Sequence, residues 1–326
     1  MYDYLLPDQR DAFAKAEKEY EEAKKKYLAE ASKYRFFANK DLLSSPPVRR
    51  AAYSDRTAWA MACMAQLAYY PFEVDDVSLA LFVSKLDSGG FTLVEKFDVQ
   101  GTQAFLAQNE IYAVLAFRGT EKNWQDVQSD IRAHRTKTEG GRIHAGFYGA
   151  YGLVSERIKQ KMPEVEHLPL YITGHSLGGA LATLATQDLE KSGFKDQIAA
   201  CYTYGSPRVG NVFFDATIKS PIYRMINFID IVTFVPLLAM GFIHVGDLRY
   251  LNRGFPDQVR RWRPVSQRVY FLLSFFSLLV PAIGAHGIQH YVDKLERIAL
   301  EQNVGLMMAI AQKENEQFNQ YAQPKV

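Results

Sequence analysis

The sequence contains few cysteines, little net charge and no apolar run as long as a typical membrane-spanning helix. Two cysteines are too few to form a disulfide framework. A net charge of +2, with a pI near 8.3, is too small to indicate a nucleic-acid partner. The histidines other than His286 and His290 form no H-x-x-x-H pair, and no cysteine and histidine cluster has the spacing of metal ligands. We therefore expect a globular protein without nucleic acid, metal or cofactor.

The two cysteines, Cys63 and Cys201, can form one disulfide or remain as free thiols. Cys201 lies in IAACYTYGSP, which is typical of a buried strand, so we expect two buried free thiols. The first residues, MYDYLLPDQRDAFAK, lack the basic and apolar regions of a Sec signal peptide. These features favour a reducing compartment. The expected location is cytoplasmic or peripheral to a membrane, although export without a leader leaves no such signal.

The first 50 residues are predicted to form a helical extension. Aromatic residues recur every seven positions between residues 8 and 38, and they define one apolar stripe on a long helix: Phe13, Tyr20, Tyr27 and Tyr34. Such a helix packs along the domain or mediates self-association. Pro46 and Pro47 end the pattern. Residues 51–326 are then expected to form the main domain.

Strand and helix patterns alternate through the main domain. Strands are predicted at FTLVEKFD, TQAFLAQN, IYAVLAFRG, LPLYITG, QIAACYTYG and YRMINFIDIV. Helices are predicted at HAGFYGAYGLVSERIKQKM and GALATLATQDLEKSG, between strands. This alternation predicts an α/β fold with a mostly parallel central sheet flanked by helices.

The segment ITGHSLGG, residues 172–179, joins a predicted strand to a predicted helix. The spacing Gly174-x-Ser176-x-Gly178 is typical of a turn that holds a nucleophilic serine in a strained conformation. The following helix would direct free backbone N–H groups, such as that of Leu177, towards a developing oxyanion. Alternatively, Ser176 is an unreactive serine in a glycine-rich turn.

Three motifs in fixed order, GHSLGG, TYGSPRVGN and RMINFIDIVTFVP, resemble the class 3 lipases, which are related to fungal triacylglycerol lipases. The segments VLAFRGTEKNWQDVQSD, IHAGFYGAY and HVGDLRYL are similar to the same family. The resemblance covers roughly residues 55 to 300. It implies an α/β-hydrolase fold, a Ser–Asp–His triad and the hydrolysis of lipid carboxylic esters through an acyl-enzyme.

The resemblance also implies which residues complete the triad. Asp230, in NFIDIV, matches the position of the acid, and Asp247 is the nearest alternative. His286 matches the position of the base because Tyr291 follows it by five residues, as the family pattern requires. His290 is the alternative base, but it is expected to face elsewhere on a helix.

The oxyanion site is implied by the same resemblance. The family uses the residue after Arg-Gly, which is Thr120 here, together with the backbone N–H after the nucleophile, which belongs to Leu177. The sequence departs from the family pattern at Ala285, where an aspartate often precedes the base. That departure concerns the alignment around His286 and removes no group that the chemistry needs.

One apolar segment, Val269–Ala285, contains 17 residues without a charge and follows a stretch rich in arginine. A single membrane crossing there would put the acid and the base on opposite sides of the bilayer, so we expect none. Residues 237–285 are instead interpreted as a cap or a lipid-facing insertion, in which residues 260–285 contact a lipid surface. A buried helix of the main domain is the alternative.

The expected function is therefore that of a lipase or esterase acting on lipid esters. A phospholipase A1-type acyl hydrolase is the alternative within enzymes. A catalytically inactive lipid-binding protein is the alternative outside them.

Overall fold

The computed structural model describes residues 37, 52–119, 135–138, 140–227, 230–236, 238–251, 259–261 and 286–301. Internal contacts divide the chain into Met1–Ala38 and Asn39–Val326, and the fold reported below belongs to the second unit. Apart from residue 37, the predicted N-terminal extension lies outside the described residues. The apolar segment 269–285 also lies outside them. The proposed division at residue 50 therefore stays a prediction.

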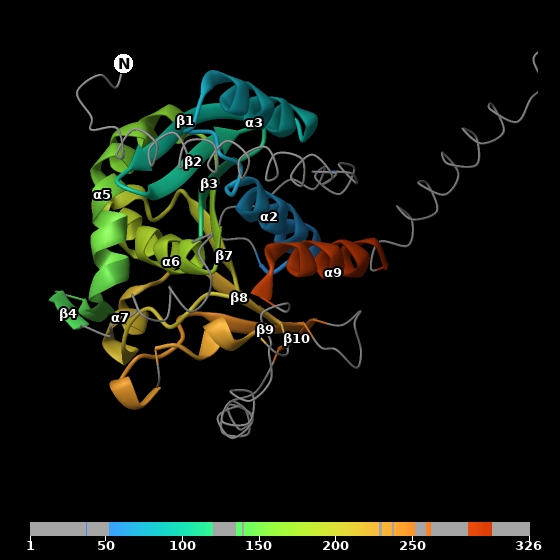
Figure 1. Ribbon diagram of the computed structural model, residues 1–326. Helices are drawn as coiled ribbons and strands as arrows, with labels where there is room; N and C mark the ends of the chain where they lie inside the picture. The colour runs from blue at the N-terminus through green and yellow to red at the C-terminus, as the bar shows by residue number, and fades with distance from the viewer. Residues whose placement is uncertain are drawn as a thin grey trace, which may run out of the picture. The chain divides into compact units, whose positions relative to one another are not determined.

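An eight-stranded sheet in the order β1-β2-β3-β6-β7-β8-β9-β10 forms the centre of this unit (Figure 1). Its strands are β1 (Thr92–Val99), β2 (Thr102–Gln108), β3 (Ala113–Phe117), β6 (Leu170–His175), β7 (Ile198–Tyr204), β8 (Ile222–Asn227), β9 (Asp247–Leu251) and β10 (Val259–Arg261). Neighbours from β3 to β9 pair in parallel. The pairs at both edges are antiparallel. The prediction of a mostly parallel sheet is confirmed.

Helices cover both faces of the sheet (Figure 1). On one face α5 (Ala145–Lys161) packs on α6 (Leu177–Leu189), and on the other α2 (Asp55–Leu67) packs on the sheet and on α9 (Ile288–Glu301). Every residue of β3, β6, β7 and β8 is buried, as expected of strands with a helix layer on each side. The prediction of a sheet flanked by helices is thus confirmed.

Smaller elements surround this frame. They are α3 (Asp76–Ser88), α7 (Val212–Thr217), the hairpin of β4 (Arg135–Thr138) and β5 (Gly141–His144), and the short helical turns η2 (Met162–Val165), η3 (Glu190–Phe194), η4 (Ile231–Phe234) and η5 (Leu238–Met240). Helix α3 was not among the helices predicted from the sequence. It forms because Asp75 caps its N-terminus and Phe82 and Leu86 pack inwards.

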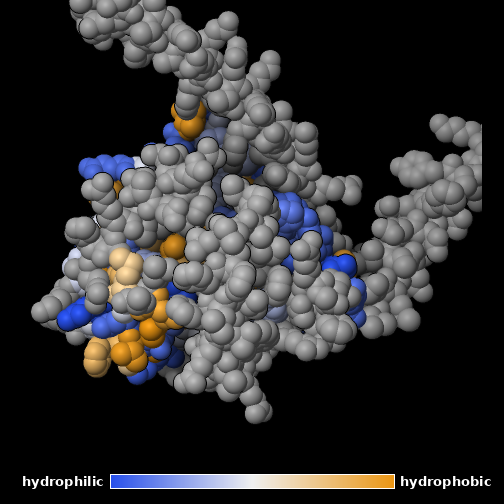
Figure 2. Space-filling view, turned by 60° about the horizontal axis from the view of Figure 1, so that its bottom comes forward, coloured by the Kyte–Doolittle hydropathy of each residue, from blue (hydrophilic) through white to orange (hydrophobic). Residues whose placement is uncertain are grey.

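Two features of the described residues concern membrane crossing and the exposed apolar surface. Among the described helices, none combines the length and apolar character that crossing a bilayer requires. Apolar side chains gather on one face, visible at the lower left of Figure 2. Among the described residues, the large apolar side chains that are exposed include Val212 and Phe213 of α7 and Leu238 of η5.

Strands β6, β7 and β8 run parallel, so their carboxyl ends lie along one edge of the sheet. In sheets of this kind, ligands bind outside the carboxyl ends of the strands. The turn at Ser176 follows β6, and the loop carrying Asp230 follows β8. The topology therefore brings two predicted site residues to the same edge, although 54 positions separate them in the sequence (230 − 176).

Candidate active site

Ser176 occupies a tight turn between the last residue of β6 and the first residue of α6. Its backbone has φ 56° and ψ −126°, a region that residues with a side chain rarely adopt. The Ser176 N–H donates to the Tyr204 carbonyl at 2.9 Å, which ties the turn to β7. Strained conformations of this kind persist where surrounding structure holds them, and they concentrate at functional sites.

The glycines on either side of Ser176 allow backbones to approach closely. A Cβ atom at Gly174 would lie 2.2 Å from the Gly178 carbonyl oxygen. A Cβ atom at Gly178 would lie 2.3 Å from the Phe117 carbonyl oxygen, at the end of β3. Any side chain at either position would force the start of α6 away from the sheet. The Gly-x-Ser-x-Gly spacing is therefore a steric requirement of this turn.

The structure brings Ser176, His286 and Asp230 into one chain of hydrogen bonds. His286 Nε2 lies 2.8 Å from Ser176 Oγ, and His286 Nδ1 lies 2.9 Å from each carboxylate oxygen of Asp230. Asp230 is fully buried, whereas the His286 side chain is 20% exposed. A carboxylate can only accept, so the neutral imidazole carries its proton on Nδ1 and presents Nε2 as the acceptor for the serine proton.

Two further donors hold the buried Asp230 carboxylate. The Val232 N–H donates to Oδ1 at 3.0 Å, and the Tyr291 hydroxyl donates to Oδ2 at 2.5 Å. Tyr291 also accepts a hydrogen bond from the Asn227 N–H at 3.1 Å, so it joins β8 to α9. These donors replace the water that the carboxylate lost on burial. Sequence reasoning used Tyr291 only to align His286, and the five-residue spacing was the available signal of its role.

The two alternative residues lie elsewhere. Asp247 begins β9 and accepts a hydrogen bond from Arg249 at 2.9 Å. His290 is exposed on α9. Of the two predicted oxyanion residues, Leu177 is the first residue of α6, where backbone N–H groups have no acceptor within the helix. Thr120 lies outside the described residues.

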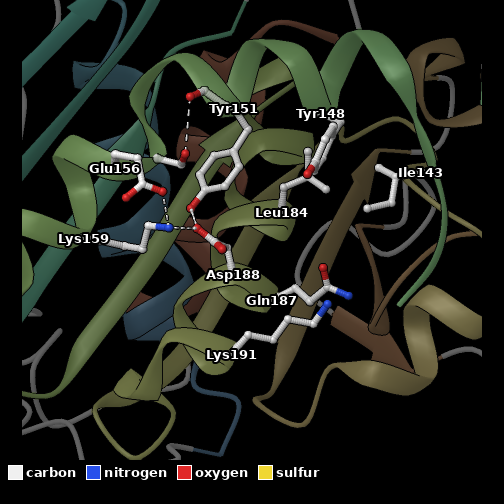
Figure 3. A pocket seen from close by; sticks show the side chains of 11 residues that line it. Ile143, Tyr148, Tyr151, Glu156, Lys159, Leu184, Gln187, Asp188 and Lys191 are labelled. Atoms are coloured by element: carbon white, nitrogen blue, oxygen red, sulfur yellow. Dashed lines mark hydrogen bonds and ion pairs between the residues drawn. The ribbon is translucent and has the colours of Figure 1, made fainter. Parts of the chain in front are cut away.

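A separate pocket lies between α5 and α6 (Figure 3). Several of its polar side chains interact: the Tyr151 hydroxyl donates to Asp188 at 2.8 Å, and Lys159 bridges Glu156 and Asp188. Asp188 lies twelve residues after Ser176 along α6, a separation of about 18 Å at the helical rise of 1.5 Å per residue. This pocket is therefore not part of the triad site.

Comparison with known proteins gives one family and several relatives. Residues 114–240 match the family model described as Lipase (class 3). The chain is 31% identical over 175 residues to a lipase of Rhizomucor miehei, an alignment covering 50% of this chain and 48% of the relative. It is 36% identical over 140 residues to the secreted mono- and diacylglycerol lipase A of Penicillium cyclopium, covering 40% and 45%. The alignments span about half the length of these curated relatives.

Solved structures show the fold. A triacylglycerol lipase structure, described as having a serine protease triad at its catalytic centre, matches with a TM-score of 0.56 and 20% identity. The match covers 74% of this chain and 94% of that one. At this identity the similarity concerns the fold alone, and it confirms the expected α/β-hydrolase fold.

The expected cytoplasmic or membrane-peripheral location is wrong. Relatives of this chain are named as secreted lipases, a finding that points away from the cytoplasm. Cys63 and Cys201 form no disulfide and both are buried, as predicted, with Cys63 1% exposed and Cys201 fully buried. Burial shields a thiol from oxidants in every compartment, so these cysteines do not indicate a reducing one.

Proposed function

Because residues 114–240 match the class 3 lipase family, we propose that the chain belongs to it and is a serine hydrolase that cleaves carboxylic esters of lipids through an acyl-enzyme. The observation that carries this proposal is the continuous contact from Ser176 Oγ through the His286 ring to Asp230, at 2.8 and 2.9 Å. A hydroxyl becomes nucleophilic when an adjacent base takes its proton and a third group orients that base.

The proposed reaction assigns one role to each group. His286 Nε2 takes the proton as Ser176 Oγ attacks the ester carbonyl carbon, while Asp230 holds Nδ1–H and stabilises the imidazolium. The backbone N–H of Leu177, and that of Thr120 by family resemblance, stabilise the oxyanion. His286 then gives its proton to the leaving alcohol. Water activated by His286 releases the acid and restores Ser176.

The proposed substrates are acylglycerols, because the relatives are named as lipases and as mono- and diacylglycerol lipases. Phospholipase A1-type hydrolysis remains the alternative activity. An inactive lipid-binding protein is less well supported, since Ser176, His286 and Asp230 already form the hydrogen bonds of a working triad.

Covalent labelling tests the reaction class. We expect a fluorophosphonate to label the folded protein once, and Ser176→Ala to abolish both labelling and hydrolysis, with kcat reduced about 10⁴-fold or more. Ser155→Ala, at a half-buried serine on α5, serves as the matched control and should change neither. A folded protein that is not labelled would contradict the proposal. A panel of p-nitrophenyl esters, triacylglycerols and phospholipids then separates the two enzyme alternatives.

We further propose that residues 260–285 contact the lipid surface. The segment combines an uncharged apolar run with preceding arginines and Trp262, a composition suited to an anionic lipid interface. Replacing Phe275 and Phe276 by aspartate should lower activity on emulsions at least 10-fold more than activity on soluble short-chain esters. Val77→Asp, which charges an exposed residue of α3, is the control. Equal losses on both substrates would argue against interfacial contact.

A further inference from the structure

His175, the residue before the proposed nucleophile, is buried and uses both ring nitrogens in hydrogen bonds. Its Nε2 lies 2.6 Å from the backbone carbonyl oxygen of His286, and its Nδ1 lies 2.7 Å from the Tyr69 hydroxyl. The rings of His175 and His286 lie 4.5 Å apart between centroids, at 35°. His175 therefore contacts both the backbone carbonyl and the imidazole ring of His286, the proposed base.

The partners of His175 determine its protonation. A carbonyl oxygen can only accept, so Nε2 of His175 carries the proton and donates a hydrogen bond to the backbone carbonyl of His286. Nδ1 accepts a hydrogen bond from the Tyr69 hydroxyl. Burial and the neighbouring His286 ring hold the pKa of His175 well below its usual range. A neutral His175 remains a donor during turnover. It also adds no positive charge beside an imidazolium formed at His286.

The hydrogen bond matters because of where His286 lies. His286 stands just before α9, outside the regular hydrogen bonding of that helix, and Gly287 follows it. Its ring must still reach Ser176 Oγ and the Asp230 carboxylate together. A misplacement of about 1 Å in a catalytic geometry can cost about 100-fold in rate. A fixed backbone at His286 therefore has a direct consequence for turnover.

Tyr69 extends the arrangement to a third segment. It follows α2, and its hydroxyl packs against the backbone at Gly119, where an added Cβ atom would lie 2.1 Å from it. Gly119 follows β3 and immediately precedes Thr120. Tyr69 and His175 thus link the segment leading to the predicted oxyanion residue with the segment that carries the base.

We propose that His175 is a positioning residue, whose Nε2–H fixes the His286 backbone so that the imidazole spans Ser176 and Asp230. This inference rests on the proposed hydrolase function. His175 touches neither the substrate nor the reacting atoms in this role. It acts through His286, so its loss should lower kcat without weakening substrate binding.

Two amide substitutions separate the two ring nitrogens. The amide nitrogen in His175→Gln falls near the position of Nε2 and can still donate to the His286 carbonyl. In His175→Asn the amide oxygen can lie near the position of Nδ1 and accept from the Tyr69 hydroxyl, so the bond to His286 is lost while the contact with Tyr69 is kept. On a soluble p-nitrophenyl ester, we expect His175→Asn to lower kcat about 10- to 100-fold with KM changed less than twofold. His175→Gln should stay within about fivefold of the natural protein in kcat.

His144→Gln provides a matched control, because His144 is also buried but caps α5, away from the triad. It should leave kcat unchanged in folded protein, with folding monitored by thermal unfolding. Equal kcat for His175→Gln and His175→Asn, or an effect confined to KM, would overturn the positioning role. Failure of the natural protein to react with a fluorophosphonate would instead refute the proposed function itself, so the two failures are distinguishable.

Discussion

At the scale of single residues, the candidate site consists of more than its three reactive groups. Asp230 is held by Tyr291 and by the Val232 N–H, and His286 is held through its carbonyl by His175. These partners come from β6, α9 and the loop after β8. Each restricts a side chain or backbone that would otherwise be free to move. The geometry between Ser176 and His286 therefore depends on residues that take no part in the reaction.

Tyr291 provides a direct test of this dependence. Tyr291→Phe removes a donor from a fully buried carboxylate, and hydrogen bonds to charged groups contribute about 1.5–3 kcal/mol. We expect a comparable loss in the free energy of unfolding, measured with urea, and a fall in kcat of about tenfold on a soluble ester.

Tyr151→Phe is the control for that prediction. The Tyr151 hydroxyl also donates a hydrogen bond to a carboxylate, that of Asp188, but this contact lies between α5 and α6. This variant should lose stability and keep kcat. If both variants kept full kcat, the Tyr291 contact with Asp230 would be structural only.

At the scale of elements, helix caps and close packing explain why segments start and end where they do. The strand–turn–helix unit of β6 and α6 was predictable because its glycines, serine and apolar residues carry strong local signals. The helix α3 was missed, although Asp75 caps it by accepting from the Ser78 N–H at 2.7 Å. Only three of its thirteen residues are buried, so its apolar residues do not mark a single buried face in the sequence.

The cap of α3 can be tested at the element that it stabilises. Asp75→Ala removes the acceptor for the Ser78 N–H and should lower the free energy of unfolding by about 1 kcal/mol. Asp76→Ala removes the neighbouring carboxylate, which is also exposed but does not cap the helix. This variant should lower the free energy of unfolding by less than Asp75→Ala. Urea denaturation measures both effects. Ester hydrolysis should be unchanged in both variants, and equal destabilisation would contradict the role of the cap.

At the scale of the whole molecule, helix layers on both faces of the sheet remove its interior from solvent. Cys63 of α2 and Cys201 of β7 are both buried in this interior. Burial raises the pKa of the Cys201 thiol to about 12. Because the thiolate is the reactive form, a native thiol of this kind reacts only when the fold opens.

Thiol labelling therefore reports on the integrity of the fold. At pH 8, we expect dithionitrobenzoate to leave both cysteines of the native protein unmodified for hours and to modify both within minutes in guanidinium chloride. At a pKa near 12, about one Cys201 in 10,000 is a thiolate at this pH. Reduced glutathione added to the native sample should react at once, which shows that the reagent is active. Rapid labelling of the native protein would show that the sheet is not covered as described.

The sequence by itself determined the local features of this protein. The turn at Ser176, the buried strands and the burial of both thiols follow from short patterns, because neighbouring residues dictate backbone conformation and burial. The family motifs then supplied Asp230 and His286 in order. The structure brings His286 within hydrogen-bond distance of both Ser176 and Asp230.

Only the tertiary structure decided which side chains support that site. Tyr291 lies 61 positions from Asp230, and His175 lies 111 positions from His286. No short pattern encodes a contact over such separations. These contacts exist because parallel strands place the carboxyl ends of β6 and β8 at one edge, where His175 and Asn227 hydrogen-bond to His286 and Tyr291 at the start of α9. The residues proposed to react were thus predictable from local patterns and family motifs, whereas the residues that hold them follow from how the sheet and helices pack.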